Sequence, residues 1–190
     1  MNRSKRDKIV EAADLLFYRK GYEFTSFADI ASSVSISRGN FYYHFKTKDD
    51  ILTAVINRRL DMTEDMLNGW DIKSQNPKER IMSFVHILIS NKSKIERYGC
   101  PVGTLTTELS KLRHPALEDA TRLFSLFKTW LMQQFVALGF EDQSEPMAMH
   151  ILGRSQGVAT LLNAFKDDDF LQNEIRQMQD WLEDQIAKIQ

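Results

Sequence analysis

The chain has 190 residues, a length that fits one large domain or two smaller domains that share a core. Hydrophobic residues make up 43% and charged residues 27%, which is ordinary for a globular protein, and only 8 Gly and 4 Pro argue against a turn-rich β-sandwich. No apolar run approaches the roughly 20 residues of a membrane span. The basic N-terminus leads into an amphipathic stretch rather than a secretory apolar region. We therefore expect a soluble, cytoplasmic protein with no membrane partner.

The chemistry-bearing side chains do not form the patterns of an enzyme. A single cysteine excludes an intramolecular disulfide framework and a cysteine-rich zinc site. There is no phosphate-binding loop, no dinucleotide glycine fingerprint and no pair of histidines at metal-binding spacing. We expect no metal, no cofactor and no catalysis. A nucleophilic cysteine paired with a distant histidine is the remaining enzymatic alternative, and nothing in the spacing supports it. The four histidines are scattered at positions 44, 86, 114 and 150.

The charge is unevenly distributed along the chain. The formal net charge is −1, but residues 1–48 hold nine Lys and Arg against five Asp and Glu, so this segment carries +4 and the remainder −5. Such an asymmetry places any nucleic-acid surface in the first quarter of the chain, because the rest would repel phosphate. A chance local fluctuation in composition is the alternative.

Four helices are predicted in the first sixty residues. Apolar side chains over residues 4–20 repeat with the spacing of one helix face, and Gly21 suits the position that ends a helix. Ser26, with Asp29 three residues later, resembles a capping box that starts a second helix running to about residue 34. Ser37 can cap a short third helix, and a fourth begins near residue 48, where acidic residues favour a helix N-terminus.

The remaining sequence also has helical periodicity and no strand-like alternation. Further helices are predicted over residues 78–98, from Pro101 onward, and over residues 115–138, 146–165 and 170–189. The fold class is therefore all-α. We expect two domains, over residues 1–50 and 51–190. The family resemblance carried by residues 26–51, given below, implies that the first is a three-helix helix-turn-helix DNA-binding domain and the second a helical ligand-binding and dimerisation domain.

Residues 26–45 fit the helix-turn-helix arrangement, in which a second helix enters the major groove of DNA. Ala31 is small enough for the two helices to cross closely, and apolar residues at 30, 34, 36 and 41 can lock the pair. The second helix is also unusually rich in polar and aromatic groups for its length: Arg38, Asn40, Tyr42, Tyr43 and His44.

This segment resembles the tetracycline-repressor (TetR) family. The family pattern is roughly Thr-x-x-x-Ile-Ala-x-x-Ala-Gly-Val-Ser-Lys-Gly-Thr-Leu-Tyr-x-x-Phe-x-x-Lys-Glu-x-Leu, and here the corresponding stretch runs from Ser26 to Ile51. Phe17 and Gly21 also stand where the family has an aromatic residue and a helix-ending glycine, so the resemblance covers about residues 5–55. The main departure is Ser35 in place of a glycine, which is costly if that turn residue has a positive φ.

The resemblance implies which residues face DNA. Arg38 is the candidate for a bidentate contact to guanine, and Asn40 could contact a base edge or a phosphate. Tyr42 and Tyr43 would combine phosphate contact with packing on thymine methyl groups, although Tyr43 could instead pack on the first helix and His44 could simply cap its own helix. Phosphate contacts are expected from Thr25, Ser26 and Lys48. The full predicted DNA-binding set is Thr25, Ser26, Ser37, Arg38, Asn40, Tyr42, Tyr43, His44 and Lys48.

The resemblance also implies a homodimer that binds a palindromic operator and is released by a small-molecule inducer. The last two helices would pair across the dimer, with Gly153, Gly157 and Ala164 permitting close approach; a monomeric core would explain the same apolar stripe. We expect a repressor, and an activator is possible on the same fold. A non-specific architectural DNA protein and a ligand-free interaction module are further alternatives, the first disfavoured by the acidic body.

The inducer pocket is predicted from the aromatic and polar residues of the middle helices, although most of these side chains could equally belong to the core. Cys100 stands just before Pro101, where helix amides would favour a thiolate that reacts with an oxidant or electrophile. The alternative is a small buried hydrophobic residue. The candidate ligand-binding residues are Phe84, His86, Tyr98, Cys100, Phe124, Phe127 and Trp130.

Overall fold

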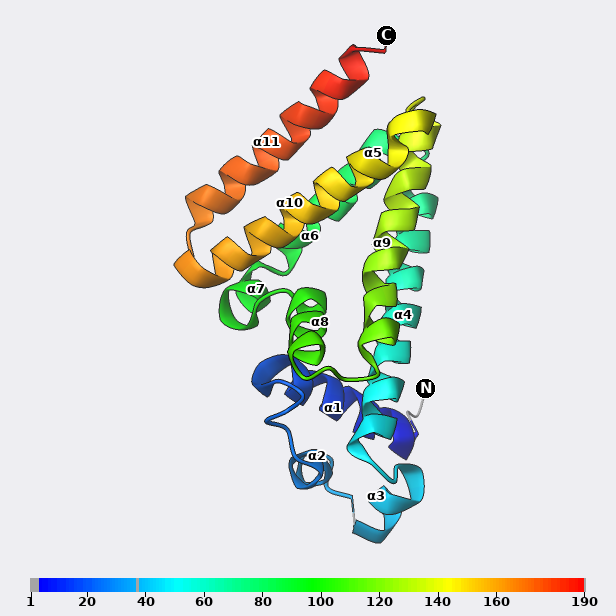
Figure 1. Cartoon of the computed structure of the whole chain (residues 1–190), viewed down its shortest axis with the longest axis vertical. Coiled ribbons are helices and arrows are strands. Elements are labelled where there is room, and N and C mark those ends of the chain that lie inside the picture. Colours follow the sequence, from blue (N-terminus) through cyan, green and yellow to red (C-terminus); the bar gives the residue numbers. More distant parts are fainter. Residues whose placement is uncertain (1–3, 37, 190) are drawn as a thin grey trace. The chain divides into compact units, whose positions relative to one another are not determined.

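A computed structural model of the chain describes residues 4–36 and 38–189, with the side chain of residue 38 excluded. Over these residues the secondary structure is entirely helical, as the sequence predicts (Figure 1). The helices are α1 (Lys5–Lys20), α2 (Phe27–Ser33), α3 (Arg38–His44), α4 (Lys48–Lys73), α5 (Pro77–Val85), α6 (Ile87–Ser90), α7 (Lys92–Tyr98), α8 (Pro101–Lys111), α9 (Leu117–Ala137), the short 3₁₀ helix η1 (Glu141–Gln143), α10 (Ser144–Phe165) and α11 (Asp168–Ala187).

The chain divides into two compact units. Unit 1 comprises residues 1–62 and 101–123, and unit 2 comprises residues 63–100 and 124–190. Helices α4 and α9 therefore each begin in unit 1 and end in unit 2. Unit 1 contains the expected DNA-binding segment together with α8 and the start of α9, two elements that lie about fifty residues further along the chain. The functional boundary predicted between residues 50 and 51 stays a prediction.

The first helices of unit 1 begin at side-chain caps. Ser26 accepts a hydrogen bond from the Asp29 amide while the Asp29 carboxylate accepts one from the Ser26 amide, so the predicted capping box is present. Ser4 and Asp7 form the same arrangement at α1. Such caps satisfy amide groups that the first turn of a helix would otherwise leave unpaired. The buried core of these helices includes Ile9, Val10, Ala13, Phe17, Ile30, Phe41 and Phe45.

The turns on either side of α2 contain residues with positive φ angles. Gly21 follows α1 with φ 89° and ψ 158°, a conformation that only glycine adopts without strain. Ser35, in the turn between α2 and α3, has φ 52°. The sequence departs from the family pattern at this position, and the backbone of Ser35 is held in the left-handed region, which the usual glycine would occupy freely.

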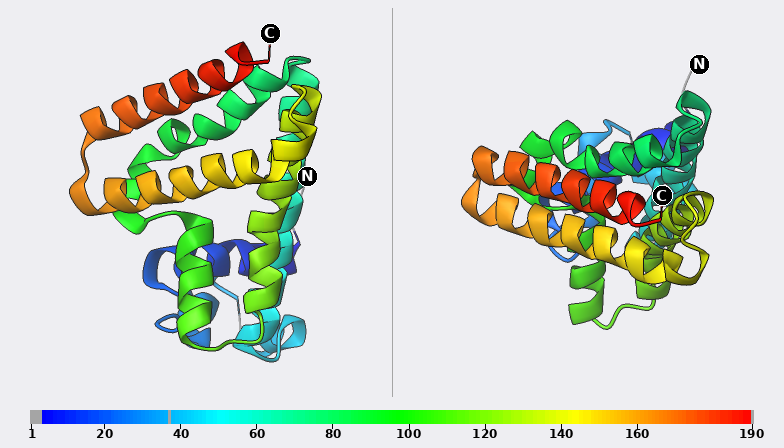
Figure 2. Two further views of the ribbon diagram at one scale, coloured as in Figure 1. Left: turned by 45° about the horizontal axis from the view of Figure 1, so that its top comes forward. Right: turned by 90° about the horizontal axis from the view of Figure 1, so that it is seen from above.

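In unit 2, α10 and α11 run antiparallel and side by side (Figures 1 and 2). Their facing sides are apolar, and ion pairs join α11 to the helices around it. Arg154 on α10 lies 2.9 Å from Glu174 on α11, and Lys92 on α7 lies 2.8 Å from Asp168 at the start of α11. The side chains that α10 and α11 bury include Ile151, Leu152, Val158, Leu162, Leu171, Ile175, Met178 and Leu182.

The predicted helix over residues 78–98 is wrong in one respect, because the structure divides it into α5, α6 and α7. The breaks fall at His86 and Asn91. The Asn91 side-chain amide donates to the carbonyl of Ile87 at 3.2 Å, a local bond that competes with regular helix geometry. Helix α10 also starts two residues before Pro146, which is tolerated in a first turn because no intrahelical partner is needed there.

A polar network is built into the core of unit 2. The indole of Trp130 donates to the carboxylate of Asp71, with distances of 3.1 and 3.2 Å to the two oxygens. Arg80 lies 3.5 Å from the same carboxylate and donates to the side chain of Gln134, which is buried. These bonds satisfy groups that would be costly to bury unpaired, and they join the end of α4 to α5 and α9. Within the described ranges, no helix is both long and apolar enough to cross a bilayer.

Candidate nucleic-acid interface

Helix α3 displays a polar and aromatic surface on a buried anchor. Phe41 and Phe45 are buried and fix one side of this segment in the core of unit 1. On the other side Tyr42 is 49% and Tyr43 is 78% exposed, and Asn40 is half-buried. Exposed aromatic rings in such numbers are unusual for a seven-residue helix, so this surface is suited to a partner.

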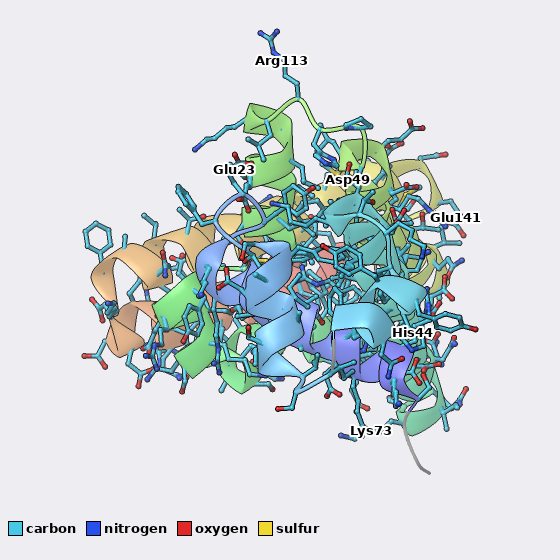
Figure 3. All side chains as sticks on the ribbon, turned by 90° about the horizontal axis from the view of Figure 1, so that it is seen from below. Glu23, His44, Asp49, Lys73, Arg113 and Glu141 are labelled. Carbon is cyan, nitrogen blue, oxygen red and sulfur yellow. The ribbon has the colours of Figure 1, made fainter. Side chains whose placement is uncertain are left out.

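The two tyrosines differ in how they are held. The Tyr42 ring lies 5.0 Å from the Phe27 ring of α2, which limits its rotation. Tyr43 has no such support from α1, since its ring is largely exposed and its described ring contact is with His44 at 5.2 Å. The alternative in which Tyr43 packs on the first helix is therefore absent from this structure. His44 ends α3 and is half-buried, and Figure 3 labels it at the lower face of unit 1.

Two members of the predicted set lie outside what the structure describes. Ser37, the expected cap of α3, lies outside the described residues, and so does the side chain of Arg38. Their roles as cap and as base-reading residue stay predictions from the sequence.

The structure separates the two residues expected to contact phosphate before α2. Ser26 is exposed at the N-terminus of α2, where its hydroxyl caps the helix. Thr25 is fully buried, and its hydroxyl donates to the Gly21 carbonyl at 2.7 Å. Because the Thr25 hydroxyl is enclosed and already bonded, we correct its assignment from a phosphate contact to a structural residue of the turn.

Lys48 has an internal role that the sequence does not reveal. Its ammonium group donates to the Tyr22 carbonyl at 2.9 Å and to the Glu23 carbonyl at 3.4 Å, and it lies 4.1 Å from the centre of the Tyr22 ring. A cation over an aromatic face is stabilised by the ring quadrupole. Lys48 therefore joins the start of α4 to the turn after α1, and any phosphate contact would be added to that role.

The acidic residues near this surface are used as caps. The backbone amide of Ser26 holds the pKa of Asp29 below its ordinary value, and that of Thr47 does the same for the pKa of Asp50. Both carboxylates are therefore ionised at neutral pH, but their charge is directed at helix N-termini. Exposed cations remain on the same unit, including Lys5, Arg6, Lys8, Arg19, Lys20 and Lys46.

Sequence reasoning missed a cluster of polar residues around Tyr22. The Tyr22 hydroxyl donates to Asp49, its ring lies 5.0 Å from that of His114, and its amide donates to Glu108 of α8. Burial and the neighbouring Asp49 carboxylate raise the pKa of the Tyr22 phenol well above its ordinary value. No local pattern could have revealed the cluster, because Tyr22 and Glu108 are separated by 86 positions. Figure 3 labels Glu23 and Asp49 in this region, and Arg113, whose side chain extends outward from the α8–α9 loop.

The predicted ligand-binding residues are brought together only in part. Phe84 and Phe127 are buried with their ring centres 5.3 Å apart, and Trp130 is buried with its indole bonded to Asp71. Tyr98, Cys100 and Phe124 are half-buried. His86 is exposed at the break between α5 and α6, and its contact with a ligand stays a prediction.

Cys100 is half-buried and directly precedes α8, which begins at Pro101 as predicted. The neighbouring Arg97 guanidinium lies 5.3 Å from the centre of the Tyr98 ring. The sensor and the structural interpretations of Cys100 both stay open predictions. Among the described residues, no three metal-ligating side chains of His, Cys, Asp or Glu are grouped as a metal site requires.

Comparison with known proteins identifies relatives of the whole chain and of the N-terminal segment. The sequence profile of "Bacterial regulatory proteins, tetR family" matches residues 9–55. An uncharacterised HTH-type transcriptional regulator in the lacX 3′ region of Lactococcus lactis subsp. lactis is 30% identical over 175 residues, which cover 90% of this chain and 89% of that protein.

Two further comparisons concern the N-terminal segment and the fold. The biofilm operon icaADBC HTH-type negative transcriptional regulator IcaR of Staphylococcus aureus (strain Newman) is 48% identical over 71 residues, covering 37% of this chain and 36% of that protein. A crystal structure of a TetR transcriptional regulator from Legionella pneumophila superposes with a TM-score of 0.82 at 26% identity, covering 94% of this chain and 97% of that one. The likeness thus extends over both units.

Proposed function

Because this chain belongs to the tetR family of bacterial regulatory proteins and is a transcriptional regulator, we propose that it is a repressor that binds a palindromic operator as a homodimer. A small-molecule inducer releases it from the operator. The sign of regulation follows the relative IcaR, which is a negative regulator by name. As a regulator of bacterial genes it acts in the cytoplasm, where the DNA lies.

The observation that carries the proposal is the exposed face of α3. Side chains that can contact bases or phosphates stand on a helix whose other face is anchored in the core by Phe41. A recognition helix needs this division, because its position in the major groove depends on a rigid anchor. Asn40, Tyr42 and Tyr43 would contact DNA together with Ser37, Arg38, His44 and Lys48, and Ser26 would meet a phosphate at the N-terminus of α2.

The homodimer is supported by the outer face of α10. Met149, Leu161 and Phe165 are exposed there although apolar, and Phe165 is 72% exposed. Gly153 and Gly157 lie between them at intervals of four residues, so successive members of this row are neighbours on the helix surface. A Cβ at either glycine would meet open space. In contrast, Met178 and Leu182 of α11 are buried within the protomer.

The inducer site is proposed in unit 2, where the predicted aromatic residues of α5 and α9 meet. Trp130, Phe84 and Phe127 supply apolar area, and the Asp71 carboxylate beside the Trp130 indole supplies a polar group that could orient a ligand. A ligand that enters between these helices would have to reorder their contacts.

Selection of bound fragments from genomic DNA tests the proposal, followed by affinity titration at two salt concentrations. We expect a palindromic site whose half-sites are about one helical turn apart, because a twofold dimer presents its recognition helices at that spacing. Affinity should fall as salt rises. No enrichment above non-specific binding would contradict the proposal.

The Arg38→Ala variant tests base reading within that site. Loss of a bidentate contact to guanine should cost about 1–3 kcal/mol and relax the preference at one position of each half-site. Arg176→Ala is the matched control, since it removes the same charge from an exposed position on α11 in unit 2. Unchanged preference at every position in Arg38→Ala would show that another residue reads the site.

A further inference from the structure

The turn after α1 is held by a carboxylate that comes from far along the chain. The amide of Tyr22 donates to one oxygen of Glu108 at 2.9 Å, and the amide of Glu23 donates to the other oxygen at 2.9 Å. Both oxygens of the carboxylate are therefore bonded to consecutive backbone groups. Hydrogen bonds to a charged acceptor are stronger than those between neutral groups, and two of them fix direction as well as distance.

Gly21 is what allows the carboxylate to approach. A Cβ atom at this position would lie 2.8 Å from one Glu108 oxygen, closer than real Cβ contacts come. The φ of 89° turns the next two amides toward α8. The conformation of the turn and the position of the Glu108 carboxylate therefore depend on each other. A chance contact between a surface side chain and a loop would not require such a match.

Helix α8 is also held at its other end. Arg59 of α4 donates to the Pro101 carbonyl at 2.8 Å and pairs with Asp14 of α1 at 2.7 Å. The Arg59 side chain is largely buried, so this bond is protected from water. With Glu108 near its C-terminus, α8 is bonded at both ends to the first helices of the chain and the turn after α1. It cannot shift without breaking a bond or carrying the turn with it.

The turn after α1 is also bonded to the start of α4. The Tyr22 hydroxyl donates to Asp49, and the Lys48 ammonium donates to the Tyr22 carbonyl. His114, which follows α8, lies 3.7 Å from the same Asp49 carboxylate. Only three residues separate α3 from α4. A displacement of the turn therefore reaches both the helix-turn-helix, which begins four residues after Tyr22, and the end of α3.

We propose that Glu108 is a positioning residue for DNA binding: its carboxylate sets the turn at residues 21–23, and through that turn it sets the placement of α2 and α3 on the operator. The inference rests on the proposed operator binding. Glu108 does not touch DNA in this assignment, and its effect on affinity passes through the two amide groups.

The sign of the charge effect makes this assignment testable. Removing a carboxylate from a DNA-binding unit should by itself strengthen binding, because one source of repulsion from phosphate is lost. A positioning role requires the opposite result. Glu118→Ala is the matched control, since Glu118 is an exposed carboxylate of unit 1 on α9.

The experiment uses the full chain in four forms: wild type, Glu108→Ala, Glu108→Gln and Glu118→Ala. Affinity for the selected operator is measured together with amide hydrogen exchange of the peptide that contains residues 21–24. Glu108→Ala removes both hydrogen bonds. We expect it to bind at least roughly ten-fold more weakly, the factor that the loss of one charge-assisted hydrogen bond would give, and to exchange faster at Tyr22 and Glu23. Glu108→Gln keeps one acceptor oxygen and should fall between wild type and Glu108→Ala. Glu118→Ala should bind at least as tightly as wild type, with unchanged exchange.

Far-UV circular dichroism reports on the folding of the variants, because the described elements of unit 1 are all helical. If Glu108→Ala does not fold, Glu108→Gln carries the test alone. Wild-type affinity in the folded variants overturns the proposal, and so does weaker binding without faster exchange at Tyr22 and Glu23. If wild type itself shows no site-specific binding, the proposed function fails, whereas the exchange measurement still decides whether Glu108 holds the turn.

Discussion

Single residues of unit 1 carry conformations and charges that are costly in isolation. Ser35 has a positive φ, Gly21 has a φ that other residues avoid, and the Tyr22 phenol lies against a carboxylate. Each of these is held by neighbours rather than by its own preference. Substitutions at these positions therefore measure the free-energy cost of holding each residue in the conformation that the fold requires.

Ser35→Gly should raise the free energy of unfolding by about 0.5–1 kcal/mol, because glycine adopts φ near 52° without the clash that a Cβ introduces. Chemical denaturation measures the change. Ser110→Gly, in an exposed position of α8, is the control and should lower stability by about 0.5 kcal/mol, since glycine disfavours a helix. Equal losses in the two variants would contradict the turn assignment.

Tyr22→Phe should be less stable than wild type by about 1.5–3 kcal/mol at neutral pH, because the hydroxyl that donates to Asp49 is lost. The pKa of Tyr22 is raised in the folded state, so this contribution is complete below the ordinary tyrosine pKa of about 10 and is lost as pH rises through the folded-state value. The stability gap should therefore narrow at alkaline pH.

Absorbance titration of tyrosinate provides an independent reading. Wild type has five tyrosines, one of which should ionise late, and Tyr22→Phe should lack that late step. Tyr43→Phe is the control, because its exposed ring has no carboxylate partner among the described contacts. A late step that persists in Tyr22→Phe would place the perturbed phenol elsewhere.

At the scale of elements, α10 has two faces of different character. The inner face packs in the protomer with Ile151, Val158 and Leu162, whereas the outer face exposes a row of small and apolar residues. A helix that served only a monomeric core would be polar on its outer side. The outer face of α10 is therefore the part of the element that the homodimer proposal uses.

Gly157→Arg should convert the dimer to a monomer, because the added side chain enters open space in the protomer but collides with a second copy packed on α10. Helix propensity by itself favours the change by roughly 0.8 kcal/mol, so the protomer should not be destabilised. Sedimentation velocity measures the mass of the assembly in solution. Operator affinity should fall as the dimer is lost.

Gly69→Arg is the matched control. Gly69 on α4 also faces open space and is exposed, and it lies outside the α10 face. The Gly69→Arg variant should leave the mass of the assembly and the operator affinity unchanged. A Gly157→Arg protein that still sediments as a dimer would show that the copies pair through another surface.

At the scale of the whole molecule, α4 and α9 each run from one unit into the other. A helix that is continuous across a boundary favours cooperative unfolding, since neither unit can melt completely without fraying an element of its neighbour. A ligand that stabilises unit 1 should therefore also raise the unfolding temperature of unit 2.

Operator DNA at 100 times its dissociation constant should add about 2.7 kcal/mol to the stability of the folded state. Tryptophan emission follows unit 2 alone, because Trp70, Trp130 and Trp181 lie there. The emission midpoint should nevertheless rise by about 5–10 °C for a protein of this size. DNA of equal length without the operator is the control. An unmoved emission midpoint, with unit 1 stabilised, would mean that the units unfold separately.

The sequence by itself determined the all-helical class, the helix-turn-helix segment and most helix ends. These features depend on local causes: the spacing of apolar residues, the Ser26–Asp29 capping box and the glycine after α1 act within a few positions. The spacing of apolar residues did not predict the breaks at His86 and Asn91, because a one-residue interruption leaves that spacing nearly intact.

Only the tertiary structure decided which side chains are available for function. Thr25 and Lys48 are polar residues in a DNA-binding segment, yet one is enclosed and the other is bonded to the turn after α1. The Glu108 contact with that turn joins residues 86 positions apart. Contacts of this kind depend on how distant helices pack, and no pattern of neighbouring residues encodes them, because the hydrogen bond exists only when both segments are in place.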